Sequence, residues 1–238
     1  MVGGLTEQAE AHVLPYGYWN CSMQWRLDSG PVKVGYTTLP ADGWGDGVKN
    51  SFIDRASDAT SRWSPYVAAS NPTGNGLQWV GAGALKYISF LTGSLAPGTL
   101  GQAEVGSGCT VMHGTKADMP GLVFITIATR PDWFTQDDSR RAHWEGCPGS
   151  SYSTTYTCQK LYDVGSTMAH ELGHAIGLAH PSQVVADGHG SNALILAKCS
   201  NVLDQATMCQ ASDAGPGTYR THRRTLDGWD TTSVAYHY

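Results

Sequence analysis

Residues 170–180 read HELGHAIGLAH, and this stretch contains the strongest chemical pattern in the chain. In a helix, residues four apart lie one turn apart on the same face, so His170 and His174 can both present an imidazole to one metal ion. Imidazole nitrogens bind zinc at about 2.0–2.1 Å. Glu171 lies one step round the helix, beside the ion, where a carboxylate can take a proton from a metal-bound water. The stretch predicts a zinc-binding helix.

His180 can join the same ion only if the backbone changes direction. In a continuous helix it would lie about 240° round the axis from His174. Gly177 is where the chain can turn, because glycine accepts positive φ and commonly ends helices in that conformation. Pro181 also discourages continuation of the helix. Three neutral imidazoles leave the fourth tetrahedral position for water, which is typical of a catalytic zinc site and not of a structural one.

A bare His-Glu-x-x-His pattern also occurs by chance, in exposed helices whose histidines have no function. Here the surrounding residues predict a well-patterned helix from about 164 to 176, with Asp163 as its N-cap. The face away from the histidines is apolar, with Met168, Leu172, Ala175 and Ile176. This amphipathic pattern favours the metal-binding interpretation.

The five fixed positions His170, Glu171, His174, Gly177 and His180 match the pattern of the metzincin zinc endopeptidases, which the chain therefore resembles. It resembles the matrixin-type catalytic domain most, in the order of its expected elements as well as in this motif. That order is a strand at 32–36, a helix ending near 63, the segment 98–103, a strand at 122–128 with Trp133 after it, and then the zinc helix.

The resemblance implies several further features. Met208 is expected in a tight turn below the zinc. The fold is expected to be a metzincin-like twisted, mainly parallel sheet with two long helices, forming a single catalytic domain over 1–238. The zinc cleft would separate an upper lobe (about 1–180) from a smaller, irregular lower lobe (about 181–238) with a C-terminal helix. Substrate would bind extended beside an edge strand within 106–113.

The residue patterns predict the same α+β class. A helix is expected over about 46–63, because Val48, Phe52, Ala56, Ala59 and Trp63 draw one apolar stripe. Alternating or apolar stretches predict strands at 31–37, 77–80, 86–91, 100–105 and 122–128, the last as a central strand buried on both faces. A further helix is expected over 219–229.

Composition excludes several classes of protein. Of 238 residues, 41% are apolar and 15% charged, which excludes a solvated, disordered chain. The formal net charge is −5 and no basic stripe is present, because the short basic segment 220–224 is expected to be a solvated helix face. We therefore expect no nucleic-acid partner. No apolar run approaches the length of about 18 residues that a membrane span requires.

The cysteines indicate whether the protein is located in an oxidising or a reducing compartment. None of the six forms a Cys-x-x-Cys pair, so a thiolate zinc site or a thioredoxin-type motif is not expected. An even number in a loop-rich chain predicts three disulfides and a secreted protein, although a cytosolic protein with six thiols stays open. Local loop closure favours pairing Cys147 with Cys158 and Cys199 with Cys209, which leaves Cys21 with Cys109. No signal peptide is visible at the N-terminus.

The predicted function is that of a secreted, monomeric zinc-dependent endopeptidase acting on protein or peptide substrates, with Glu171 as general base. Two other hypotheses stay open: a zinc-bearing binding or inhibitory module without turnover, and a zinc hydrolase acting on a non-peptide amide. A calcium ion is a further expected cofactor through the resemblance, with Asp132, Asp137 and Asp138 as candidates, although a solvated turn explains these residues too. The remaining histidines are expected to be surface or core residues: His12, His113, His143, His189, His222 and His237.

Overall fold

The computed structural model describes residues 30–39, 48–82, 87–110, 119–129, 133–134, 162–178, 180, 207–208, 226, 230–231 and 234. Several sequence predictions therefore lie outside the described residues. These are the disulfide pairs, the calcium candidates, the six remaining histidines, the helix over 219–229 and most of the lower lobe. Within the described part of the chain, no helix is long and apolar enough to cross a bilayer.

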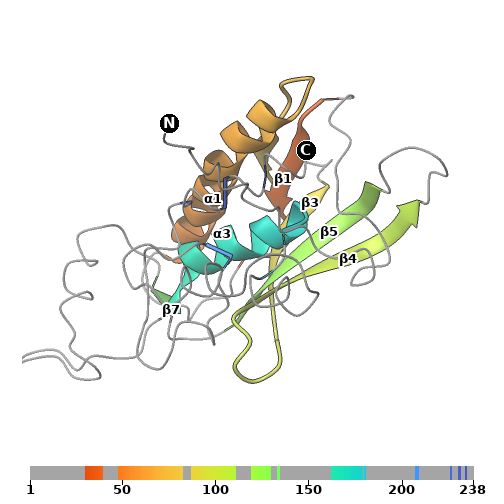
Figure 1. Cartoon of the computed structure of the whole chain (residues 1–238). Coiled ribbons are helices and arrows are strands. Elements are labelled where there is room, and N and C mark those ends of the chain that lie inside the picture. The colour runs from red at the N-terminus through yellow and green to blue at the C-terminus, as the bar shows by residue number, and fades with distance from the viewer. Residues whose placement is uncertain are drawn as a thin grey trace, which may run out of the picture.

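The described residues form an α+β fold around a five-stranded sheet (Figure 1). The strand order is β2-β1-β3-β5-β4, and every neighbouring pair is parallel except β5 with β4. The predicted class and the mostly parallel sheet are thus confirmed. The strands are β1 (Val32–Tyr36), β2 (Leu77–Gly81), β3 (Ile88–Gly93), β4 (Gly101–Thr110) and β5 (Met119–Ala128).

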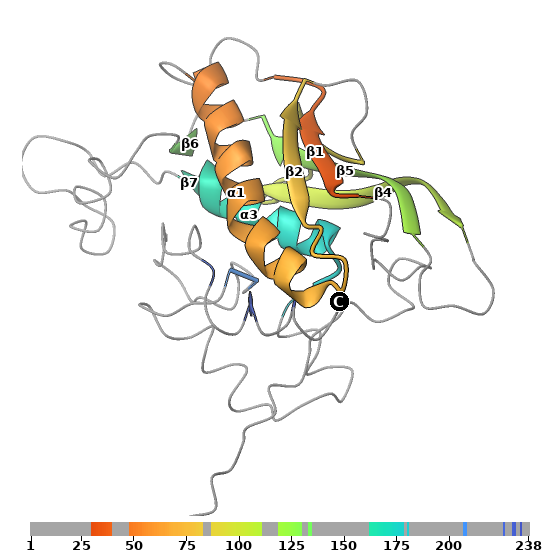
Figure 2. The same cartoon turned by 90° about the horizontal axis from the view of Figure 1, so that it is seen from above.

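One face of the sheet is the apolar core. Val34, Ile88 and Val123 are register neighbours on β1, β3 and β5, and each is fully buried. Helix α1 (Val48–Ser70) packs against β1 and β2, and helix α3 (Val164–Ala175) packs against β4 and β5 (Figure 2). The two helices also contact each other, so they form one layer over this face.

The other face of the sheet is only partly covered. Along β5, buried Val123, Ile125 and Ile127 alternate with residues that keep some exposure, and Leu122 is 36% exposed. The prediction that this strand lies in the interior of the sheet is confirmed, because β5 pairs with β3 and β4, but the prediction that it is buried on both faces was wrong. The strand is second from the edge of the sheet, and both described helices cover the same face, so its alternate side chains lack a helix above them.

Helix α1 is longer than its sequence pattern predicted. The expected end near Trp63 was wrong, because the helix continues to Ser70 and includes Pro65. Val67 extends the apolar stripe by one more turn and is fully buried, which offsets the missing proline N–H. Ser64 fixes this end of the helix to β2, since its hydroxyl donates to Leu77 O and accepts from Leu77 N.

The antiparallel strand β4 lies at the edge of the sheet, beside helix α3. The sequence placed an edge strand within 106–113, but β4 begins earlier, at Gly101, and ends at Thr110. A separate pair of short parallel strands, β6 (Trp133–Phe134) and β7 (Tyr162–Asp163), leads directly into α3. Helix α3 carries His170 and His174, and β4 packs against this helix.

Candidate metal centre

Helix α3 ends in the turn that the sequence requires for His180. Gly177 has φ of 100°, a left-handed conformation that glycine adopts without strain. The Gly177 N–H donates to His174 O and the Leu178 N–H donates to Gly173 O, which is the bond pair of a Schellman motif. The predicted bend at Gly177 is therefore confirmed. It reverses the chain so that His180 returns toward the helix.

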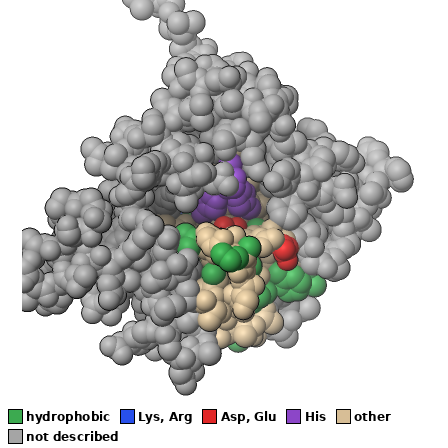
Figure 3. Space-filling view, turned by 90° about the horizontal axis from the view of Figure 1, so that it is seen from below, with side chains coloured by type: hydrophobic (Ala, Val, Ile, Leu, Met, Phe, Trp, Pro, Cys, Tyr) green, Lys and Arg blue, Asp and Glu red, His purple; other side chains and the backbone are tan. Residues whose placement is uncertain are grey.

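The three histidines converge on one point. The Nε2 atoms of His170 and His174 each lie 2.9 Å from Nε2 of His180, and the candidate ligand atoms all lie within 4.8 Å of one another. His170 and His174 are 9% and 8% exposed. Figure 3 shows histidine side chains gathered on one face of the molecule, with an acidic side chain beside them. The three residues are close enough to bind a metal ion.

Backbone carbonyls fix the protonation of two of these rings. His170 Nδ1 lies 2.7 Å from Thr207 O, and His174 Nδ1 lies 2.7 Å from Leu178 O. A carbonyl oxygen only accepts, so each Nδ1 must carry the proton and donate it. In the neutral ring, Nε2 then carries a lone pair, which faces the shared point. This arrangement, with the far nitrogen donating to a carbonyl, is usual for histidines that bind metals.

Burial keeps His174 in its neutral form. Loss of hydration lowers the pKa of His174 to about 4, and this effect exceeds the opposite effect of its hydrogen bond to Leu178 O. At neutral pH the His174 ring is therefore already neutral and can act as a ligand without first losing a proton. The donor set fits zinc: two ligands of a tetrahedral ion with bonds of about 2.0–2.1 Å lie about 3.3 Å apart, close to the spacing of the Nε2 atoms.

Met208 packs against the metal-binding helix from below. It is fully buried, and a Cβ added to Gly173 would overlap with its sulfur. The same added Cβ would lie 3.1 Å from the ring of Trp63 on α1. Trp63 also donates from Nε1 to Ala169 O at 2.8 Å, which fixes α1 to α3. The sequence singled out Met208, and the structure places it against the helix that carries the histidines.

Asp230 supports the same turn, and the sequence analysis missed it. Its carboxylate is buried and accepts from the backbone N–H groups of Thr207 at 2.8 Å and Met208 at 3.2 Å. Thr207 in turn accepts the His170 proton through its carbonyl. A chain of hydrogen bonds thus runs from Asp230 through Thr207 to His170. No local motif marks Asp230, since its partners lie far away in the sequence.

We expect Asp230→Ala to lower the free energy of unfolding by about 2–4 kcal/mol, because two buried N–H donors lose their acceptor. Chemical denaturation of both proteins measures the change. Asp58→Ala is the matched control, since Asp58 is half-exposed and makes only an ion pair with Arg55, which is expected to contribute no more than about 1 kcal/mol. Equal losses in the two variants would contradict the role assigned to Asp230.

Glu171 lies beside the histidines, buried at 6% exposure. Loss of hydration raises its pKa to about 8, against the opposite effect of a hydrogen bond from the Ala103 backbone N–H. Without a nearby cation the carboxyl therefore holds its proton at neutral pH. A divalent ion between the three histidines would lower this pKa and release the carboxylate form. Burial next to a cation site is typical of a carboxylate that moves protons.

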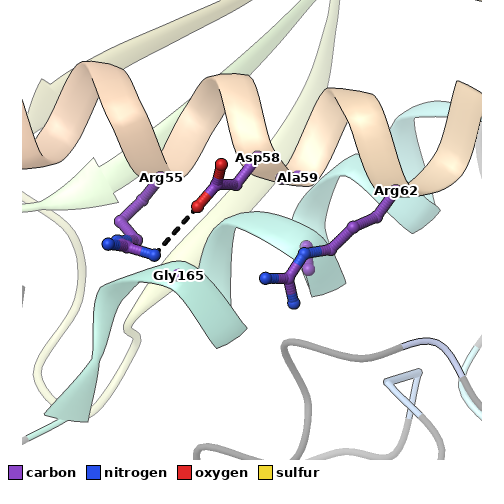
Figure 4. A pocket seen from close by; sticks show the side chains of 6 residues that line it. Arg55, Asp58, Ala59, Arg62 and Gly165 are labelled. Atoms are coloured by element: carbon purple, nitrogen blue, oxygen red, sulfur yellow. Dashed lines mark hydrogen bonds and ion pairs between the residues drawn. The ribbon is translucent and has the colours of Figure 1, made fainter. Parts of the chain in front are cut away.

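Apart from the histidine cluster, a pocket lies between α1 and the start of α3 (Figure 4). Arg55 and Arg62 reach over the first turns of α3 there, and Arg55 pairs with Asp58 at 2.8 Å. Gly165 and Ala169 form its floor on α3. The pocket contains no histidine and its cationic charge is partly neutralised within the pocket, so we do not assign it to the metal centre.

The structure thus brings together the three predicted ligands His170, His174 and His180, and it places Glu171 buried on the helix that carries two of them. The contacts that the sequence analysis missed are those of Asp230 and of Ala103, which come from distant parts of the chain. Comparison of the chain with models of known protein families and with curated protein sequences found no match.

Proposed function

We propose that this protein is a zinc-dependent endopeptidase of the metzincin type, with His170, His174 and His180 as zinc ligands and Glu171 as general base. The observation that carries the proposal is the convergence of three imidazole Nε2 atoms beside a buried carboxylate. Three histidine ligands are typical of zinc sites that keep a position open for chemistry. A structural zinc site has no need of a neighbouring base.

A bound zinc ion would supply Lewis acidity and lower the pKa of water toward about 7. Glu171 then accepts the proton of the attacking water and delivers it to the amine that leaves. Thr207 O and Leu178 O hold the His170 and His174 rings in the tautomer whose Nε2 atoms face the ion. Asp230 and Met208 keep the supporting turn in place below the helix.

An extended peptide is the substrate that the surroundings favour. β4 is the edge strand of the sheet, and β5 is its one partner among the described strands. The first residues of β4 lie against Glu171, so a peptide paired with the outer edge of β4 would pass beside the base. Main-chain pairing of this kind needs an extended backbone, which a polypeptide has and a small amide lacks. This observation favours endopeptidase activity over hydrolysis of a non-peptide amide.

The proposal extends to a secreted, monomeric enzyme, and the even number of cysteines with no Cys-x-x-Cys pair supports secretion. A zinc-bearing binding module without turnover is the competing hypothesis. Glu171 speaks against it, because burying a carboxyl group costs stability and a module that only binds gains nothing from it. The six cysteines are testable separately, by counting free thiols in the denatured protein.

Cleavage of denatured casein and of a peptide library tests the function directly. We expect the purified protein to contain one zinc ion per chain, to cleave internal peptide bonds, to lose activity with a chelator and to regain it with added zinc. The library also supplies the cleavage preference. Zinc binding without any cleavage would contradict the endopeptidase assignment and favour the binding module, and cleavage of small amides alone would favour the non-peptide hydrolase.

A further inference from the structure

The first residues of β4 lie unusually close to the side chain of Glu171. A Cβ added to Gly101 would lie 2.6 Å from Glu171 Cγ and 2.9 Å from its Oε1. It would also lie 2.9 Å from the Thr167 methyl group, one turn earlier on α3. Separations below 3.0 Å are not tolerated by real Cβ atoms, so the glutamate occupies space that any side chain at residue 101 would need.

Two residues further along β4, the backbone contacts the same glutamate. The Ala103 N–H donates a hydrogen bond to the Glu171 carboxyl group, and the Ala103 side chain is 5% exposed. Gly101 and Ala103 are opposite Ile127 and Ile125 of β5, so the sheet fixes both residues in place. Glu171 is therefore held between its own helix and a rigid strand.

We propose that Gly101 and Ala103 of the edge strand are positioning residues for Glu171: Gly101 leaves the space in which the carboxylate lies, and the Ala103 N–H fixes its orientation. This inference rests on the proposed function, in which Glu171 is the base. It assigns β4 a second role besides peptide pairing. A base displaced by about 1 Å can lose up to about 100-fold in rate, so the space at residue 101 has a catalytic consequence.

Gly101→Ala is the direct test. We expect kcat to fall about 10- to 100-fold while KM changes little and zinc content stays at one per chain, because the base moves and the ligands do not. Gly93→Ala is the matched control on β3, where an added Cβ would meet only the Thr126 methyl group at 3.1 Å. A rise in KM with kcat unchanged would mean that residue 101 serves peptide binding, and it would overturn the inference.

A double-mutant cycle measures the same contact without any assay of cleavage. Gly101→Ala is made in the wild type and in Glu171→Ala, and the midpoint of thermal unfolding is measured for the metal-free and the zinc-loaded proteins. We expect Gly101→Ala to lower the midpoint more in the wild type than in Glu171→Ala, where the space of the carboxylate is vacated and only the Thr167 contact remains. The Thr167 contact is common to both backgrounds and cancels. Additive shifts would contradict the inference.

The two proposals fail in different ways. If the wild type cleaves nothing, the proposed function fails, and the thermal cycle still decides whether residue 101 and Glu171 compete for space. If the wild type cleaves and Gly101→Ala keeps its kcat, the inference fails alone. Should Gly101→Ala not fold, Ala103→Pro removes the N–H donor of this buried residue, and Ala103→Val, which adds similar volume and keeps the N–H, is its control. Ala103→Pro too is expected to lower kcat, and an unchanged kcat would overturn the role of Ala103.

Discussion

Glu171→Gln is expected to lower kcat for peptide cleavage by about 10²- to 10⁴-fold while one zinc ion stays bound per chain. Glutamine keeps an oxygen that accepts the Ala103 N–H, and it nearly matches glutamate in size, so it fits the space beside Gly101. It cannot take up a proton from water. The loss of kcat in Glu171→Gln therefore reports on proton transfer alone. Glu171→Ala would change both proton transfer and packing. Steady-state kinetics and metal analysis of the same samples give both quantities.

Asp54→Asn provides the control for Glu171→Gln, since Asp54 is exposed on α1 and lies outside the metal centre. Its kcat is expected to equal that of the wild type. The metal-free form of Glu171→Gln should also be at least as stable as the wild type above pH 8, because the wild type, whose Glu171 pKa is raised from 4.5 to about 8 by burial, loses stability as the pH rises from 4.5 through 8. A Glu171→Gln variant that cleaves at the wild-type rate would disprove the assignment of the base.

His174→Ala is expected to remove zinc from the protein as purified and to weaken zinc affinity by more than about 100-fold. Loss of a residue that merely supports a ligand already costs about 10- to 100-fold, so loss of the ligand itself should cost more. The two imidazoles that stay, His170 and His180, then hold the ion alone. Competition with a chromogenic chelator measures the affinity of the wild type and the variant.

Val67→Ala tests whether zinc loss follows from general destabilisation. Val67 is fully buried on α1 and is not among the site residues, and its truncation is expected to cost roughly 1–3 kcal/mol of stability. This variant should keep its zinc affinity. If Val67→Ala loses zinc as His174→Ala does, or if His174→Ala binds zinc as tightly as the wild type, the ligand assignment is wrong.

Helix α3 and the turn that follows it were predictable because the information for them is local. Ligand spacing, the apolar face and the turn at Gly177 all lie within 164–180, and each obeys the period of a helix or the φ preference of glycine. The same holds for the cores of the strands, where β-branched residues mark β5 and β1. These parts of the fold needed no knowledge of which elements pack together.

The misjudged features depend on tertiary contacts. Helix α1 continues past Pro65 because Val67 finds a buried place, which the local pattern did not indicate. β5 is open on one face because both helices pack on the other. Asp230 accepts two backbone hydrogen bonds and Ala103 donates one, and each of these residues comes from a distant part of the chain. Such contacts leave no periodic trace in a single sequence.

The position of Asp230 near the end of the sequence means that it is synthesised after the residues that it supports. His170, Glu171, His174 and His180 are all synthesised before the carboxylate that holds the Thr207 turn and, through it, the His170 ring. A nascent chain that has not yet reached Asp230 already has every ligand but lacks part of the framework that orients them. A translation product that ends before Asp230 would therefore carry the complete histidine motif without the carboxylate that supports the Thr207 turn.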